Sequence, residues 1–144
     1  MKKRVLFLCT GNSCRSQMAE GLINHDFGDR IAAFSAGTEP HGLNPKAVQV
    51  MQEIGMDISH HRSQHLDDFA DQHFDYVITL CGDANEKCPV FLGGVRRLHM
   101  GFDDPPKAEG SEAEVMDVYR RVRDDIRQQL GDFFRQQLGP PQHD

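Results

Sequence analysis

Near the start of the chain, a cysteine and an arginine with five residues between them could act together on an anion. They belong to the stretch Cys9-Thr10-Gly11-Asn12-Ser13-Cys14-Arg15-Ser16. An apolar run precedes this stretch and an amphipathic pattern follows it, so we expect a strand, a tight loop and a helix N-terminus. Backbone N–H groups of such a loop, together with the helix dipole, attract negative charge. We therefore predict that residues 10–16 form a cradle for an oxyanion.

Three side chains of this stretch predict nucleophilic chemistry on the bound oxyanion. Arg15 can clamp two oxygens of a tetrahedral anion. The amide donors, the helix end and the guanidinium all favour a thiolate at Cys9, so we expect its pKa to lie well below that of a free thiol. The Ser16 hydroxyl is placed to donate to the same sulfur. The alternative is a buried structural Cys9 beside a turn, with Arg15 on the surface, but it leaves the strand–loop–helix context unexplained.

An Asp-Pro pair, Asp104-Pro105, follows the last predicted strand and should lie over the same edge of the sheet. A carboxyl group held near a bound oxyanion can stay protonated and act as a general acid. Taken alone, Asp-Pro is typical of a turn. Beside the cysteine–arginine loop, we interpret Asp104 as the acid. Asp103 is the weaker candidate because no proline follows it.

Two further cysteines, Cys81 and Cys88, flank a polar segment. If that segment were helical, their Cα atoms would be about 10 Å apart, whereas a disulfide needs roughly 4.4–6.8 Å. A bond between them would therefore require the segment to loop out, which its polar composition permits. Two alternatives stay open: a pair of small buried side chains, and a four-cysteine zinc site. The zinc site is disfavoured because no closely spaced Cys-x2-Cys pair occurs.

The overall composition narrows the class of protein. The 144 residues suit one domain, predicted at 1–139 with a flexible tail at 140–144. The net charge of −6, from 22 acidic and 16 basic residues, argues against nucleic acid or an anionic membrane as the main partner. The N-terminal apolar run is too short for an export signal, and no run reaches membrane-spanning length. We therefore expect a cytoplasmic protein whose thiols stay reduced.

Alternating patterns predict strands at 4–8, 31–36, 75–80 and 95–99. Helices are predicted at 14–27, 45–54 after an Asn44 N-cap, 66–70, and from a Ser111–Glu114 capping box onward. The near-continuous apolar strands indicate the α/β class: a single-domain, doubly wound, four-stranded parallel sheet with helices on both faces. Ligands of such sheets bind beyond the strand C-termini. Cys9 and Cys81 both follow strands at that edge, so they can be neighbours in space.

The cysteine loop, Asp104-Pro105 and the order of elements resemble the low-molecular-weight protein tyrosine phosphatase fold. Residues 37–45, 81–89 and 101–105 resemble more closely the thioredoxin-coupled arsenate reductases that share this fold. The resemblance runs from about Arg4 to Phe134, nearly the whole chain. The three-cysteine pattern of Cys9, Cys81 and Cys88 is its most specific part.

The resemblance implies a thiol relay that detoxifies arsenate. Cys9 attacks arsenate in the cradle while Asp104 protonates the departing oxygen. Cys81 then attacks Cys9, so arsenite leaves and a disulfide joins the two. Cys88 attacks Cys81 in turn, and thioredoxin reduces the resulting Cys81–Cys88 disulfide. Arg15 holds the oxyanion throughout.

Two departures from the family pattern bear on the substrate and on metals. Tyrosine phosphatases of this fold carry a tyrosine beside the Asp-Pro loop, and its absence here weakens phosphotyrosine as substrate. Some of the reductases hold a potassium ion, which here would lie near Asn12, Glu20 and Ser35. Arg62 and Gln64 stand where a hydroxyl and an acid are expected. We therefore predict that no metal is required and that Arg62 supplies a fixed charge instead.

Two rival functions remain open at this point. The first is a phosphomonoester or tyrosine phosphatase that uses Cys9, Arg15 and Asp104 alone. The second is a redox-regulated module that binds anions without reducing them. Phosphate and sulfate are similar in shape to arsenate and can occupy the cradle, so weak phosphatase activity is expected in either enzyme. We expect a monomer without a tightly bound cofactor, with thioredoxin as external reductant.

Overall fold

Four parallel strands form the sheet of this computed structural model, which describes residues 2–69, 71–82 and 96–139. They are β1 (Lys3–Cys9), β2 (Ile31–Gly37), β3 (Tyr76–Thr79) and β4 (Arg96–His99), in the spatial order β2-β1-β3-β4. β1 pairs in parallel with both β2 and β3, so the chain leaves β1 first to one side and then to the other. The C-terminal end of β1 is therefore the switch point at which α/β proteins bind ligands, and Cys9 stands there.

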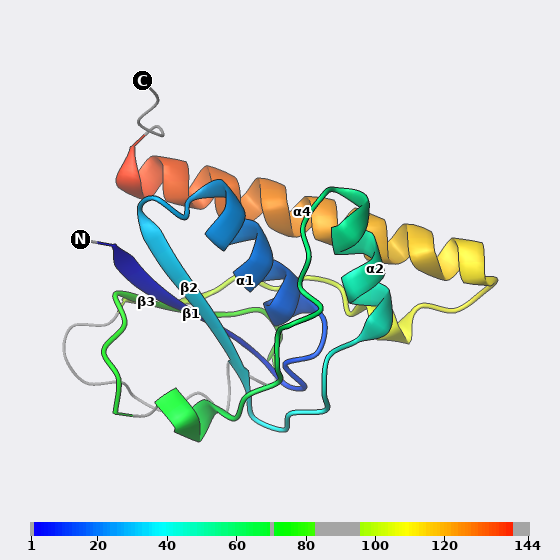
Figure 1. Ribbon diagram of the computed structural model, residues 1–144, viewed down its shortest axis with the longest axis horizontal. Coiled ribbons are helices and arrows are strands. Elements are labelled where there is room, and N and C mark those ends of the chain that lie inside the picture. The colour runs from blue at the N-terminus through cyan, green and yellow to red at the C-terminus, as the bar shows by residue number, and fades with distance from the viewer. Residues whose placement is uncertain (1, 70, 83–95, 140–144) are drawn as a thin grey trace.

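In the part of the chain that the structure describes, three α-helices accompany the sheet: α1 (Arg15–Asp26), α2 (Pro45–Glu53) and α4 (Glu112–Leu138). They lie together on one side of it, and α4 crosses the whole molecule (Figure 1). Within the described residues, the opposite face is covered by the short 3-10 helix η1 (Leu66–Phe69) and its flanking loops. Among these residues, no helix is both long and apolar enough to cross a membrane. The strands and helices predicted from the sequence are confirmed, with shifts of a residue or two at their ends. Cys88 and the predicted tail at 140–144 lie outside the described residues.

The central strand β1 is buried on both faces. Val5 and Phe7 pack into the core beneath the helices, whereas Leu6 and Leu8 point to the other side. The larger core is completed by Met18, Leu22, Val50, Met51, Ile126, Leu130 and Phe134, and the smaller by Leu66, Phe69, Phe74 and Val77. Each such side chain contributes about 1.5–3 kcal/mol when it is fully buried. Burial on both faces explains the unbroken apolar run and holds the residue that follows it, Cys9, in place.

Local capping signals fix where the helices near the cleft begin. The Asn44 side chain accepts a hydrogen bond from the Lys46 N–H at 2.8 Å, with Pro45 at the first helical position. Ser111 and Glu114 form the predicted capping box at the start of α4. Asn44 also donates its own N–H to the Ser13 carbonyl at 2.9 Å, so the start of α2 is tied directly to the cysteine loop.

Candidate active site

The cysteine loop borders a cavity of about 780 Å³ at the C-terminal end of β1. α1 begins inside the loop, at Arg15, so the helix N-terminus faces the same region. The cavity wall formed by the loop consists of Cys9, Thr10, Gly11, Ser13, Cys14 and Arg15; the opposite wall includes Cys81, Gly82, Gly101, Phe102, Asp103 and Asp104. The structure thus brings the predicted nucleophile, the arginine, the second cysteine and the acid to one cavity.

Arg15 joins the two walls of the cavity. Its Nη1 donates to the Phe102 carbonyl at 2.9 Å, and its Nη2 lies 3.6 Å from the Asp104 carboxylate. The side chain is only 9% exposed, so this ion pair is screened little by water. Its buried Nε has no hydrogen-bond partner among the described residues. An N–H of this kind is the donor that a bound oxyanion would satisfy.

Asp104, the predicted acid, and Asp103 lie in different surroundings. The Asp104 side chain is 28% exposed and faces Arg15, whereas the Asp103 side chain is 73% exposed and pairs with Arg121 at 3.0 Å on the surface. Pro105 is buried at the start of the short 3-10 helix η2 (Pro105–Lys107), which Asp104 precedes. The buried proline fixes the position of Asp104.

Cys81 is a direct neighbour of the cysteine loop. Its Sγ lies 3.3 Å from the Thr10 Oγ1, and its thiol shares a hydrogen bond with Cys9. The expected proximity of Cys9 and Cys81 is therefore confirmed. Cys9, Cys14 and Cys81 are in the thiol form, with no disulfide among them.

The expectation of a low pKa for Cys9 is wrong in this arrangement. The hydrogen bond with Cys81 and burial raise the pKa of Cys9, and they outweigh Arg15 and the Thr10 backbone N–H, which lower it. Adjacent thiols lose their protons in separate steps: the thiol that keeps its proton donates it to the first thiolate, and a second negative charge beside the first is unfavourable. In this arrangement Cys9 is the thiol that holds its proton more tightly. The prediction counted only the groups of the loop, whereas the fold adds a second sulfur.

Cys14 occupies the loop without sharing this chemistry. It is buried in the core beneath the helices, although it also borders the cavity. Burial raises the pKa of its thiol to about 12. Such a thiol is a poor nucleophile at neutral pH.

Asn12 gives the loop its sharp turn. It is the only non-glycine residue with a positive φ, 46°, in the described parts of the chain. Its Nδ2 donates to the Ser16 Oγ at 2.8 Å, and this contact joins the turn to the start of α1. Because the Ser16 oxygen accepts this bond, its own proton remains available for a donation such as the one predicted toward Cys9.

A second segment braces the loop, which the sequence analysis did not anticipate. The N–H groups of Glu39 and His41 donate to the carbonyls of Thr10 and Gly11 at 2.8 and 2.9 Å. At Gly37, an added Cβ would lie 2.5 Å from the Thr10 carbonyl oxygen, so only glycine fits there. Gly37, at the end of β2, was the one local signal in the sequence that the chain passes so close to the loop.

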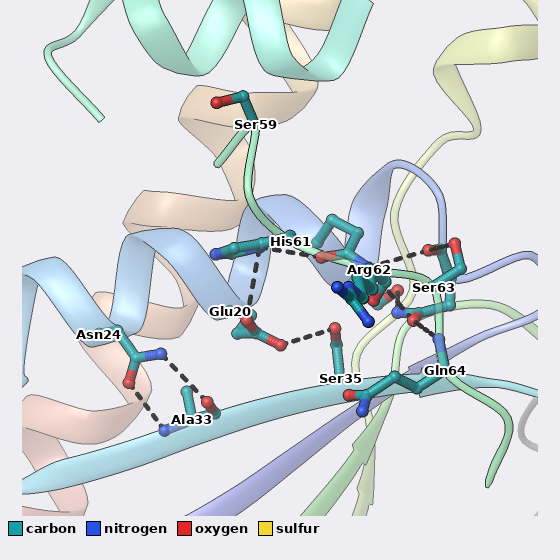
Figure 2. Close-up of polar contacts among 12 residues, drawn as sticks. Glu20, Asn24, Ala33, Ser35, Ser59, His61, Arg62, Ser63 and Gln64 are labelled. Atoms are coloured by element: carbon teal, nitrogen blue, oxygen red, sulfur yellow. Dashed lines mark hydrogen bonds and ion pairs between the residues drawn. The ribbon is translucent and has the colours of Figure 1, made fainter. Parts of the chain in front are cut away.

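The oxygens expected near a potassium ion are occupied by hydrogen-bond donors. Ser35 donates to the Glu20 Oε1 at 2.8 Å, and the Glu20 Oε2 lies 3.4 Å from the His61 Nδ1 (Figure 2). His61, rather than Arg62, therefore stands against Glu20, and the Arg62 side chain is exposed. Burial raises the pKa of Glu20 and lowers that of His61. Among the described residues, no group of three or more His, Cys, Asp or Glu is arranged to hold a metal ion.

Comparison with known proteins agrees with this geometry. A family profile described as low molecular weight phosphotyrosine protein phosphatase matches residues 4–141, and the chain belongs to this family. Within the family, its relatives include the arsenate reductase of Bacillus licheniformis, which is 53% identical over 92% of this chain and 95% of that protein.

Solved structures show the same likeness. An arsenate reductase in the phosphate binding state superposes with a TM-score of 0.75 at 32% identity, over 93% of this chain and 98% of that one. A Corynebacterium glutamicum thioredoxin-dependent arsenate reductase gives a TM-score of 0.69 at 28% identity, over 96% of this chain and 64% of that one. The fold expected from the sequence is thereby confirmed.

Proposed function

We propose that this protein reduces arsenate to arsenite by a three-cysteine relay that thioredoxin regenerates, and so detoxifies arsenic. The observation that carries the proposal is the thiol of Cys81 against Cys9 in the oxyanion cavity. A phosphatase needs only the first of these sulfurs. The arsenate reductases among its relatives support the same conclusion.

In the first step, arsenate binds through the backbone N–H groups of residues 10–16 and the Arg15 guanidinium. The Cys9 thiolate attacks the arsenic(V) atom, a sulfur–arsenic bond forms and an arsenic–oxygen bond breaks. Asp104 gives its proton to the departing oxygen, which leaves as water. The contact of Arg15 with Asp104 places this acid beside the oxyanion.

In the second step, the Cys81 thiolate attacks the Cys9 sulfur. A Cys9–Cys81 disulfide forms and the electron pair of the sulfur–arsenic bond stays on arsenic, which leaves as arsenite, reduced by two electrons. Thr10 lies at the Cys81 sulfur, where its hydroxyl can stabilise the attacking thiolate. In the third step, Cys88 attacks Cys81, so that Cys9 is released as a thiolate and a Cys81–Cys88 disulfide forms.

The dithiol of thioredoxin is the external reductant in this proposal, because it returns two electrons to the Cys81–Cys88 disulfide by the same exchange chemistry. No metal or tightly bound cofactor enters any step. The protein acts as a monomer in the cytoplasm, where thioredoxin keeps thiols reduced.

The relay is tested by measuring arsenite in the presence of thioredoxin, thioredoxin reductase and NADPH. We expect many arsenite molecules per parent protein, about one per protein for Cys88→Ser, and none for Cys9→Ser or Cys81→Ser. Hydrolysis of p-nitrophenyl phosphate serves as the matched control, because Cys81→Ser and Cys88→Ser should keep this activity. Full turnover by Cys88→Ser would contradict the relay, and a parent protein that makes no arsenite would contradict the function.

A weak phosphatase side activity is the second function that the cavity supports. The loop, Arg15 and Asp104 are sufficient for attack on a phosphate ester. No tyrosine lines the described part of the cavity, and Tyr119 is buried. We therefore expect no preference for phosphotyrosine over simple phosphate esters.

A further inference from the structure

The sharp turn of the oxyanion loop at Asn12 is held from below by other side chains. Asn12 is completely buried and has the left-handed backbone conformation that non-glycine residues adopt at a cost. Its side-chain Oδ1 accepts from the Gln64 N–H at 2.7 Å, and its carbonyl accepts from the Ser63 hydroxyl at 2.6 Å. These contacts explain part of the conformation, but both donors lie on one surface segment.

Gln17 makes the remaining contacts from inside α1. Its fully buried Nε2 lies 3.1 Å from the Asn12 carbonyl and 3.2 Å from the Asn12 Oδ1. The same nitrogen donates to the Arg62 carbonyl at 3.0 Å. The Gln17 carboxamide thus contacts both oxygens of Asn12 and links them to the segment that carries Ser63 and Gln64.

The direction of the Gln17 carboxamide is determined by what surrounds it. If the group were reversed, its oxygen would face three acceptor oxygens, which is strongly unfavourable. The Oε1 instead faces the His61 Nδ1 at 2.9 Å. Because Gln17 presents an acceptor here, this network assigns the proton of the neutral imidazole to Nδ1.

His61 is itself held by a chain of contacts that ends on the sheet. The Glu20 Oε2 lies 3.4 Å from the same His61 Nδ1, and the Glu20 Oε1 accepts from the Ser35 hydroxyl of β2 at 2.8 Å. Figure 2 shows Glu20 between His61 and Ser35. The chain of contacts therefore runs from β2 through His61 and Gln17 to the loop.

We propose that Gln17 is a positioning residue for the oxyanion loop, and that His61 sets the direction in which its carboxamide points. Gln17 holds Asn12 in the left-handed conformation, and this conformation shapes the loop around a tetrahedral oxyanion. The inference rests on the proposed function only in taking the loop as the oxyanion site. Neither side chain lines the cavity, so both act through the loop rather than on the substrate.

The experiment measures oxyanion affinity without turnover. Sulfate or phosphate is titrated while the alkylation of Cys9 by iodoacetamide is followed on the Cys9 peptide by mass spectrometry. The test variants are Gln17→Met, which removes every donated bond at similar volume, and His61→Leu, which removes the Nδ1 donor. His61→Asn is the rescue variant because its amide N–H can stand where Nδ1 does. Two control variants complete the set. Gln49→Met makes the same substitution at an exposed glutamine, and Ile126→Val lowers the melting temperature by a change in the core that does not involve the loop.

We expect Gln17→Met and His61→Leu to weaken sulfate protection about 10-fold or more and to raise the KM for arsenate more than they lower kcat. His61→Asn should return close to the parent value.

If Gln17→Met lowers the melting temperature as Ile126→Val does but leaves the anion affinity unchanged, the positioning role of Gln17 is overturned. If His61→Asn binds sulfate as weakly as His61→Leu, the role of His61 is overturned. Should Gln17→Met fail to fold, the comparison of these two His61 variants tests the proposal by itself. Sulfate protection without arsenite formation in the parent would instead contradict the proposed function.

Discussion

The two walls of the oxyanion cavity are held in different ways. The loop wall, residues 9–16, is tied by backbone hydrogen bonds to residues 39, 41 and 44 and, through Asn12, by the buried network beneath it. The opposite wall, with Cys81 and residues 101–104, is held by the Phe102 N–H on the Leu80 carbonyl at 3.2 Å, by Arg15 and by the exposed Asp103–Arg121 pair. The binding wall is therefore fixed in advance by buried contacts, while the contacts that the described residues show for the wall with the second thiol and the acid lie nearer the surface.

The difference suits the proposed chemistry. A preorganised loop stabilises the charge of the oxyanion without rearranging during the reaction. Cys81 must approach Cys9 and then exchange with Cys88, so it cannot be held as rigidly as the loop. Arg15 contacts both walls, and the comparison is tested most directly at this residue.

The largest effect is expected for Arg15→Lys. A lysine keeps the charge but loses the two-pronged clamp and the bond to the Phe102 carbonyl. We expect kcat/KM for arsenate to fall about 1,000-fold, as for the loss of a major oxyanion donor, when arsenite is measured in the thioredoxin assay. Arg121→Lys, on the surface end of the same region, is the control and should change little. A loss of less than tenfold would show that the walls do not depend on Arg15.

The next effect separates the two neighbouring aspartates. Asp104→Asn removes the proposed acid and should lower kcat about 100-fold. Asp103→Asn removes only an exposed ion pair and should stay within about threefold of the parent, because such pairs contribute little. Equal losses of kcat in the two variants would show that Asp104 is not the acid. The rates are compared by single-turnover formation of arsenite.

A smaller effect is expected at the contact between Cys9 and Cys81, the sulfur atoms that the two walls bring together. Cys81→Ala removes the hydrogen bond that most raises the pKa of Cys9. A lower pKa means more thiolate at neutral pH, so alkylation of Cys9 at pH 7 should accelerate about 10-fold, and the midpoint of its pH profile should move to lower pH. Cys14→Ser leaves that contact in place and is the control. An unchanged midpoint in Cys81→Ala would show that Cys81 does not control the proton on Cys9.

The smallest change contrasts Gly37, which packs against the loop wall, with Gly82 of the opposite wall. In Gly37→Ala, the new methyl group would meet the Thr10 carbonyl at 2.5 Å and the Asn12 nitrogen at 2.9 Å. We expect a loss of about 1–3 kcal/mol in the free energy of unfolding from this overpacking. In Gly82→Ala, the methyl group has nothing within 4 Å, so stability should change little. Urea denaturation measures both, and equal losses would contradict the difference between the walls.

Much of the fold was predictable because its signals are local. The apolar run of β1, the Asn44 cap and the Ser111–Glu114 box each fix an element through residues that are adjacent in sequence. The loop from Cys9 to Ser16 was predictable for the same reason, since the strand, the glycine and the helix start follow each other directly. The proximity of Cys81 followed from strand topology.

Other features of the site were not predictable from local signals. The pKa of Cys9 depends on a sulfur that the fold brings from another strand. The partner of Glu20 is His61 rather than Arg62, a difference of one position that decides which side chain turns inward. Gln17 appeared in the sequence only as part of an amphipathic helix, and its role depends on carbonyl groups of Asn12 and Arg62.

By itself, the sequence determined the order of strands and helices, the oxyanion loop and the three thiols, because caps, periodicity and the cysteine motif act over a few residues. Only the tertiary structure decided that Cys9 and Cys81 share a proton, which carbonyl groups accept hydrogen bonds from Gln17, and how firmly each cavity wall is held. Hydrogen bonds and charge interactions fall off over a few ångströms, so these properties depend on distances between residues that are far apart along the chain.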